Sequence, residues 1–166
     1  MNVDDAVIIA LGGNLAQEGG AVQAVLEAAL THFPAEGLTV LARSGWWRSA
    51  AWPDPAQPPF VNGVALVETR LTPRETLAAL MRIEQAFGRR RGEPNAPRTL
   101  DLDLIAHGRL RLDEPDLVLP HPRAADRLFV MGPLAQIAPG WRHPASGATA
   151  RDLAAAASVG TDAAPL

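Results

Sequence analysis

A short stretch in which leucine and aspartate alternate constrains the fold of this chain more than any other feature. It reads Thr99-Leu100-Asp101-Leu102-Asp103-Leu104-Ile105. Along a β-strand alternate side chains share a face, so the leucines point to one side and the two aspartates to the other. The stretch therefore predicts a strand whose leucines enter a hydrophobic core and whose carboxylates lie about 7 Å apart, two residues at 3.2–3.4 Å rise.

The whole chain, residues 1–166, is predicted to form one domain in which strands and helices alternate. The clearest helix start is Thr72-Pro73-Arg74-Glu75, an N-cap followed by a proline and a capping-box glutamate. Strands are predicted at 7–11, 38–43 with a continuation through Trp47, 60–69 and 99–106, and helices at 20–33, 72–87, 128–138 and 149–157. The proline-rich segment 50–59 and the polar segment 89–97 are predicted loops, and about 158–166 is a predicted frayed tail.

The composition excludes several chemistries. Of 166 residues 48% are hydrophobic, enough for a core, but the chain has no cysteine and all 15 of its basic residues are arginine. Without cysteine there is no disulfide, thiolate nucleophile or Cys-ligated zinc. A P-loop and a protein kinase each need a lysine that binds the nucleotide phosphates, so both are excluded. Catalysis through a lysine Schiff base is excluded as well. Phosphate chemistry here must therefore use arginine, metal ions and backbone N–H groups.

The charge and hydropathy pattern also limits the partners. The formal net charge is −3, which argues against a general nucleic-acid surface. No apolar run approaches the roughly 20 residues that span a bilayer, and the acidic start lacks the basic region of a signal peptide. We expect a cytoplasmic monomer with no membrane partner and no nucleic-acid partner.

Asp101 and Asp103 are the candidate metal ligands. Two carboxylates on one strand face repel each other unless a cation lies between them, and hard oxygen donors suit Mg²⁺ when substrate phosphates complete its coordination. A bare Asp-x-Asp is also typical of the exposed face of an amphipathic strand. The arginines nearby favour metal and phosphate; they are Arg89, Arg90, Arg91, Arg98, Arg123 and Arg127. Arginine pairs with phosphate oxygens through its planar fork, although a basic loop can also be simply solvated.

Phe60 and Asn62 lie two residues apart on the predicted strand 60–69 and share a face. An aromatic plane beside an amide suits a flat heterocycle with donors and acceptors on its edge, and Trp52 and Phe129 could add stacking surface. The alternative for each aromatic residue is an ordinary core position.

His121, held between two prolines, is either a hydrogen-bond donor to phosphate or a surface histidine. Glu84 either borders the apolar stripe of its helix or faces a nucleotide.

These pieces together resemble the 6-hydroxymethyl-7,8-dihydropterin pyrophosphokinase family. The resemblance runs from Ala10-Leu11-Gly12-Gly13-Asn14-Leu15 to Pro133-Leu134-Ala135-Gln136-Ile137-Ala138-Pro139. Its most specific part is 97–104, followed by Pro120-His121-Pro122-Arg123 and Arg127-Leu128-Phe129-Val130. It implies a ferredoxin-like α+β sandwich with one main, mostly antiparallel sheet and long, flexible catalytic loops. It also implies transfer of pyrophosphate from ATP to a reduced pterin, with release of AMP, in folate biosynthesis.

The resemblance further implies roles for individual residues. Two Mg²⁺ ions would be held by Asp101 and Asp103, and Arg89, Arg98 and Arg127 would act in catalysis. ATP would contact Glu84, Arg98, His121 and Arg127, and the pterin would contact Ser49, Ala50, Trp52, Phe60, Asn62 and Phe129. The chain departs from the family pattern at Asn95-Ala96, where many members have a tryptophan, and at Ala50-Ala51, where prolines are usual.

Two other functions fit parts of the sequence. A metal-dependent phosphohydrolase could use the same aspartate pair to activate water, and it would consume ATP without any pterin. A non-catalytic ferredoxin-like binding module would keep its ligand affinity after Asp101→Ala. Neither alternative explains why Phe60 and Asn62 accompany the phosphate-binding residues.

Overall fold

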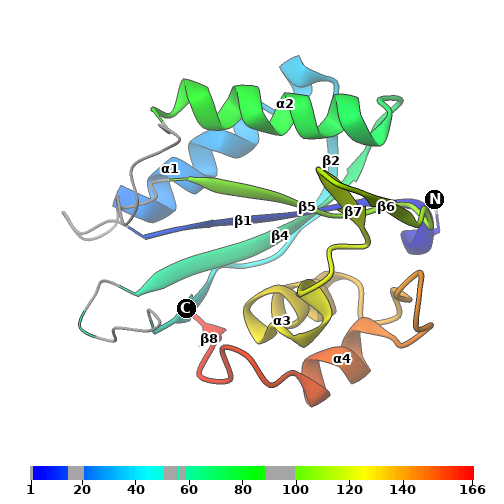
Figure 1. Cartoon of the computed structure of the whole chain (residues 1–166). Helices are drawn as coiled ribbons and strands as arrows, with labels where there is room; N and C mark the ends of the chain where they lie inside the picture. Colours follow the sequence, from blue (N-terminus) through cyan, green and yellow to red (C-terminus); the bar gives the residue numbers. More distant parts are fainter. Residues whose placement is uncertain (1, 15–20, 51–55, 57–58, 89–99) are drawn as a thin grey trace.

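The computed structural model describes residues 2–14, 21–50, 56, 59–88 and 100–166. One six-stranded sheet lies between two layers of helices, with α1 and α2 on one face and α3 and α4 on the other (Figure 1). The strands of this sheet are β1 (Val7–Gly13), β2 (Thr39–Arg43), β3 (Trp47–Ser49), β4 (Phe60–Glu68), β5 (Asp101–His107) and β8 (Ala164–Pro165). The helices are α1 (Ala21–Thr31), α2 (Pro73–Ala86), α3 (Leu128–Ile137) and α4 (Ala150–Ala156).

The strand order is β5-β1-β4-β3-β8, with β2 also paired to β4, and every pair in the sheet is antiparallel. Two short strands, β6 (Leu112–Glu114) and β7 (Leu117–Leu119), form a separate hairpin. The described residues also form three 3₁₀ turns: η1 (Val3–Asp5), η2 (Pro34–Glu36) and η3 (Ala124–Asp126). The expected α+β sandwich with one main antiparallel sheet is confirmed.

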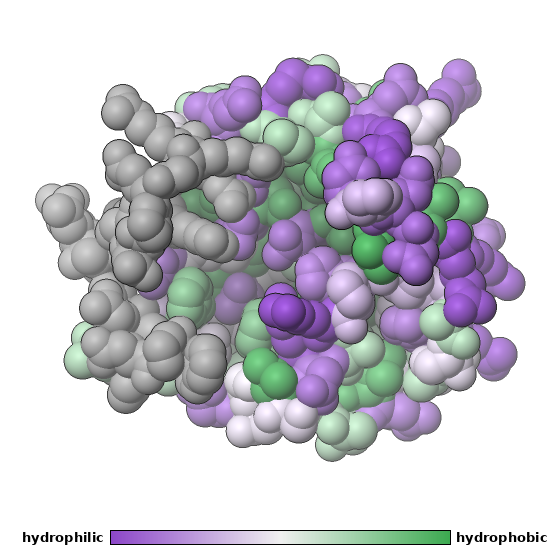
Figure 2. Space-filling view, in the orientation of Figure 1, coloured by the Kyte–Doolittle hydropathy of each residue, from purple (hydrophilic) through white to green (hydrophobic). Residues whose placement is uncertain are grey.

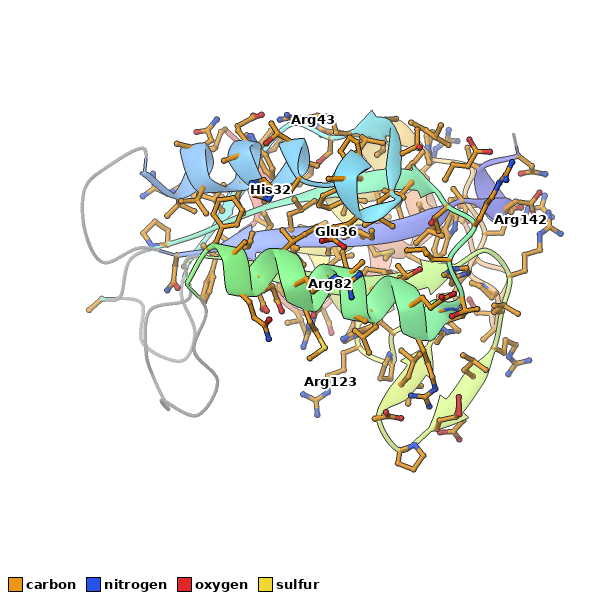
Figure 3. All side chains as sticks on the ribbon, turned by 90° about the horizontal axis from the view of Figure 1, so that it is seen from above. His32, Glu36, Arg43, Arg82, Arg123 and Arg142 are labelled. Atoms are coloured by element: carbon orange, nitrogen blue, oxygen red, sulfur yellow. The ribbon has the colours of Figure 1, made fainter. Side chains whose placement is uncertain are left out.

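The α1/α2 face of the sheet carries the larger hydrophobic core. Leu100, Leu102 and Leu104 are all buried there, as their alternation predicts. They share the core with alternate residues of β1 and with the inward stripes of the two helices; these are Val7, Ile9, Leu11, Leu26, Leu30, Phe33, Leu80 and Ile83. At the rim of this layer Arg82 of α2 reaches Glu36 of η2, with 2.9 Å between Nε and Oε2 (Figure 3).

The α3/α4 face has its own, smaller core. The intervening residues Ile8 and Ala10 of β1 pack there with Val64 and Leu66 of β4. The helices contribute Val130, Met131, Leu134 and Ala150, and the connection between them contributes Trp141. α3 approaches the sheet closely at Gly132, where a Cβ would lie 2.6 Å from the Trp47 indole ring. Outside the cores, Figure 2 shows hydrophilic residues over most of the visible surface, with apolar residues in small patches.

Local sequence signals are mostly confirmed. The Thr72 hydroxyl accepts from the Glu75 N–H at 3.2 Å and the Glu75 carboxylate accepts from the Thr72 N–H at 2.9 Å, the reciprocal bonds of a capping box. Gly88 follows α2 with φ at +81°. Among the helices of the described part of the chain, none has the length and apolar character that crossing a bilayer requires.

Two predictions differ from the structure. The strand over 38–43 does not continue through Trp47, because the Ser44 hydroxyl accepts the Val64 N–H at 2.9 Å and interrupts the regular ladder before β3 begins. The segment 158–166 is not a frayed tail: β8 pairs with β3, and the Leu166 N–H donates to the Trp46 carbonyl at 3.0 Å. Those backbone partners come from a distant part of the chain, so local composition did not indicate them.

Candidate functional site

A row of four residues crosses the α3/α4 face of the sheet. Strand pairing sets Asp101 opposite Gly12, Gly12 opposite Asn62, and Asn62 opposite Trp47. Residues paired in this way point to the same face. We call Asp101, Gly12, Asn62 and Trp47 the polar row. The name refers to the side chains of Asp101 and Asn62, and the row comes directly after the apolar residues of that face. It brings together a predicted metal ligand and a predicted pterin ligand that are far apart in the sequence.

Gly12 leaves the space that the Asn62 side chain occupies in the polar row. A Cβ at this position would lie 2.5 Å from Oδ1 of Asn62, a distance that real structures do not tolerate. The Asn62 side chain therefore lies over the bare backbone of β1, on the side of Asp101. Gly12 was not predicted to have a role at the site, although a glycine inside a strand often marks the close approach of another group.

Asp101 and Asp103 lie on β5, at one edge of the sheet, and both are partly buried. They share the α3/α4 face, while Leu102 between them points into the opposite core. No group of three or more metal-binding side chains occurs among the described residues. A pair of carboxylates without further protein ligands fits Mg²⁺, which is commonly bound by one or two carboxylates plus substrate phosphates.

Glu84 supports the same strand from α2. Its side chain is buried, with 3% of its surface exposed, and its Oε2 accepts a hydrogen bond from the Leu102 N–H at 2.9 Å. This bond is made within the stretch of β5 that carries both aspartates. Glu84 thus joins α2 to the edge strand, and its contact with ATP stays a prediction.

The predicted pterin residues line the neighbouring strands. Ser49, the last residue of β3, is paired with Phe60, the first residue of β4. Ser49 is buried and Phe60 partly buried, and both lie on the face of Asn62. Ala50 follows β3 and is exposed, and its N–H donates to the Asp162 carboxylate at 2.6 Å. Asp162 was not among the residues expected at this site.

A third group of predicted residues approaches from the η3–α3 region. His121 is fixed by its N–H, which donates to the carbonyl of Ile105 in β5 at 2.7 Å. Burial, and after it the charges of Arg127 and Arg123, lower the pKa of the His121 imidazole. Arg127 also lies over the ring of Phe129, with 5.7 Å from its guanidinium carbon to the ring centroid. Arg123 points away from the fold (Figure 3).

The described site residues therefore come from several elements. Asp101, Asp103, Asn62, Phe60 and Ser49 lie on one face of one sheet. Arg127 and Phe129 stand together at the start of α3, and His121 is docked on β5. Glu84 comes from the opposite layer. Arg89, Arg98 and Trp52 lie outside the described residues, as do the other arginines of the 89–97 segment.

Comparison with known proteins gives one consistent result. A family model described as "7,8-dihydro-6-hydroxymethylpterin-pyrophosphokinase (HPPK)" matches residues 8–139. A 2-amino-4-hydroxy-6-hydroxymethyldihydropteridine pyrophosphokinase of a Synechocystis species is 44% identical over 143 residues, covering 86% of this chain and 71% of the relative. A protein of the same name from Pseudomonas aeruginosa is 43% identical over 138 residues, covering 83% of each chain.

Solved structures extend the comparison to the fold. The wild-type HPPK-DHPS of Plasmodium falciparum superposes with a TM-score of 0.67 at 13% identity, over 90% of this chain. A second structure, an HPPK-DHPS in complex with substrates, gives a TM-score of 0.69 at 11% identity. This chain spans 44% and 42% of those chains, less than half of their length. At such low identity the likeness concerns the fold alone.

Proposed function

The chain belongs to the 7,8-dihydro-6-hydroxymethylpterin-pyrophosphokinase family, and we propose that its polar row and the neighbouring strand residues transfer pyrophosphate from ATP to the hydroxymethyl group of 6-hydroxymethyl-7,8-dihydropterin. AMP is the second product. The observation that carries the proposal is the pairing of Asp101, Gly12 and Asn62 across three strands. This pairing supports a metal-binding carboxylate beside a surface that suits a heterocycle.

In the proposed reaction the hydroxymethyl oxygen attacks the β-phosphorus of ATP in line. A new oxygen–phosphorus bond forms, the bond between the β-phosphorus and the bridging α–β oxygen breaks so that AMP leaves with that oxygen, and the hydroxyl proton passes to solvent. Asp101 and Asp103 would hold two Mg²⁺ ions, which when bound neutralise charge on the triphosphate as the phosphoryl group moves. By holding those ions, the two carboxylates would also fix the position of the triphosphate relative to the polar row.

The pterin would lie beside the polar row. Asn62 has donors and an acceptor in one amide, which matches the edge of a pterin ring, and Phe60 on the same strand face offers a flat apolar surface. Ser49 and Ala50, at the end of β3, would lie beside the same ring. Trp52 and Phe129 are proposed to complete the pterin site by stacking.

ATP would be bound mainly by arginine. Arg127 and His121 are proposed phosphate ligands. Burial is the main cause of the lowered pKa of His121, and the charges of Arg127 and Arg123 add to it; a polyphosphate would offset those two charges. Arg98 would bind the transferring group together with Arg127, and Arg89 would assist catalysis or product release. Glu84 is proposed to contact the nucleotide in addition to supporting β5.

We also propose that a single chain acts alone in the cytoplasm. All the proposed ligands are supplied by one chain, so no second copy is needed to complete the site. The absence of cysteine is compatible with a reducing compartment.

The nucleotide product tests the proposal. The purified protein is incubated with ATP, Mg²⁺ and the reduced pterin, and the mixture is separated by chromatography. AMP should appear in step with a pterin diphosphate, and only when the pterin is present. ADP as the first nucleotide product would reject the proposal, and AMP or ADP formed without pterin would favour a phosphohydrolase.

Two ATP analogues sharpen this experiment. With α,β-methylene ATP the bond that must break is replaced by a stable carbon bridge, so no AMP analogue should form. With β,γ-methylene ATP that bond is intact, and AMP should still be released when the pterin is added. A γ-phosphoryl transferase would give the opposite pattern.

A further inference from the structure

The segment 158–166 lies outside the residues that the family model matches, and it contacts two parts of the proposed pterin site. Its first residues are held by Asp126, which lies just before α3. The Asp126 carboxylate accepts from the Ser158 N–H at 2.9 Å and from the Ser158 hydroxyl at 2.7 Å, and its carbonyl accepts from the Val159 N–H at 2.9 Å. The Leu128 N–H then donates to the Val159 carbonyl at 2.9 Å. These bonds hold the segment alongside the start of α3.

Gly160 brings the segment against Phe129. Its φ is +66°, a conformation that favours glycine, and a Cβ on it would lie 2.5 Å from Cδ1 of Phe129. The Phe129 ring therefore rests directly on the Gly160 backbone. Because Arg127 lies over the same ring, the position of Phe129 also bears on that of the proposed phosphate ligand.

Asp162 connects the same segment to the other side of the site. Its Oδ2 accepts the Ala50 N–H at 2.6 Å, a bond between residues 112 positions apart in the sequence. Ala50 comes one residue after the last pair of the β3–β4 ladder, so this bond fixes its backbone where that ladder ends. A charged acceptor makes a stronger bond than a neutral one.

The far end of the segment is also held. The Ala163 N–H donates to the Gly160 carbonyl at 2.9 Å, which closes a turn around Asp162, and Ala163 is buried. Ala164 and Pro165 then pair with β3. Asp162 therefore lies in a turn whose backbone is held by hydrogen bonds, and the residues after it belong to a strand.

We propose that the segment 158–166 is a strap that shapes the pterin site, with Asp162 positioning the backbone of Ala50 and Gly160 positioning the ring of Phe129. The proposal rests on the proposed function, because it assigns the strap to the pterin and not to ATP. Asp162 and Gly160 touch neither substrate in this account. They act through residues that do, and they preorganise the pterin site before binding.

Substitution of Asp162 tests the first contact. In Asp162→Ala the dissociation constant for the pterin, measured by calorimetry with Mg²⁺ and a non-reacting ATP analogue, should rise about five- to ten-fold, the loss of one hydrogen bond to a charged group. The dissociation constant for the ATP analogue alone should change less than about two-fold. Asp162→Asn keeps an acceptor oxygen and should recover most of the pterin affinity. Asp113→Ala, an exposed carboxylate of the β6–β7 hairpin, is the matched control and should resemble the wild type.

Substitution of Gly160 tests the second contact. Gly160→Ala should weaken pterin binding about ten-fold or more, because the new Cβ displaces Phe129. Gly147→Ala is matched to it: Gly147 also has a positive φ, +74°, but a Cβ there would meet nothing within 4 Å. Both variants should lower the melting temperature through backbone strain, and only Gly160→Ala should lose pterin affinity.

The outcomes separate the strap from the proposed function. If the wild type forms no AMP and no pterin diphosphate, the proposed function fails whatever the variants do. If the wild type is active but Asp162→Ala and Gly160→Ala bind the pterin as tightly as it does, only the strap is rejected. Equal losses of pterin and ATP affinity in both variants would also reject it, since they would indicate a general structural defect.

Discussion

The two faces of the central sheet use the same strands for different purposes. On the α1/α2 face the alternate residues Val7, Ile9 and Leu11 of β1 and the leucines Leu102 and Leu104 of β5 are apolar and buried. On the α3/α4 face Ile8 and Ala10 continue the hydrophobic core, but the next residue of the same alternation is Gly12. The comparison shows that the apolar alternation gives way to polar residues at one end of the α3/α4 face, whereas the α1/α2 face stays hydrophobic over the same length of β1.

The difference has a simple physical basis. A carboxylate or amide that faces a sealed core costs several kcal/mol unless it is paired. The long, amphipathic α1 and α2 cover their face, and the buried Glu84 beneath α2 is hydrogen-bonded to Leu102. The core under α3 and α4 stops at Ala10 and Val64, one residue pair before the polar row. On the α3/α4 face the polar side chains of Asn62 and Asp101 therefore begin where that core ends.

The largest expected effect comes from removing charge on the α3/α4 face. Asp101→Asn or Asp103→Asn should lower the rate of AMP formation about a hundred-fold or more, because a charged ligand that stabilises the transition state is lost. Thermal unfolding should stay within a few degrees of the wild type. Near-normal activity in both variants at ordinary Mg²⁺ would contradict the metal assignment.

The matched variant on the α1/α2 face is Leu26→Ala, which removes a fully buried side chain of α1. It should cost about 2–5 kcal/mol of unfolding free energy. Its activity per folded molecule should remain near that of the wild type. A rate loss comparable to that of the aspartate variants would mean that the two faces are not separable.

A smaller effect is expected at the centre of the polar row. Asn62→Ala should weaken pterin binding by about 1–3 kcal/mol, the cost of leaving buried polar groups of the ligand without a partner. Gly12→Ala should do much the same, since its Cβ would lie 2.5 Å from Asn62 Oδ1 and push the amide aside. Titration of each variant with pterin and, separately, with ATP measures both affinities.

Val61→Ala is the control for this pair, because Val61 lies between Phe60 and Asn62 and packs against the opposite core. It should lose stability and keep the ratio of the two affinities. If Asn62→Ala weakens ATP and pterin binding equally, the amide is not a pterin ligand and the variant is damaged more generally.

The smallest effect concerns the pH dependence contributed by His121. Burial, Arg127 and Arg123 depress its pKa in the free protein, and a bound polyphosphate would raise it again. Protonation then accompanies ATP binding, so affinity should be higher at low pH and fall by a few-fold as pH rises through the pKa of the complex. The ATP dissociation constant measured between about pH 5.5 and 8 for the wild type and His121→Gln reports this difference.

The stability of the free protein should vary in the opposite sense. Because the folded pKa of His121 lies below its ordinary value of 6.5, the unfolded chain takes up the proton first as pH falls. The free protein therefore loses stability on acidification below about 6.5, and His121→Gln should reduce that loss. Identical pH profiles of ATP affinity in the wild type and the variant would show that His121 does not bind phosphate.

Sequence reasoning succeeded where the determining interaction is local. The capping box of Thr72 and Glu75 involves residues within one helical turn, and both of its hydrogen bonds are present. It failed where a partner comes from far along the chain. The Ser44 hydroxyl interrupts a strand because it accepts from Val64, and the segment 158–166 is ordered by Asp126, Ala50 and Trp46.

The sequence by itself determined which face each residue of 100–105 occupies, because side-chain alternation is a property of the extended backbone and needs no neighbour. It also established that phosphate chemistry here must proceed without lysine. Only the tertiary structure decided that Gly12 lies between Asp101 and Asn62, and that Asp162 meets Ala50. Strand register and long-range contacts depend on how complete surfaces pack together, and a change of one residue in register would turn every side chain of a strand to the other face.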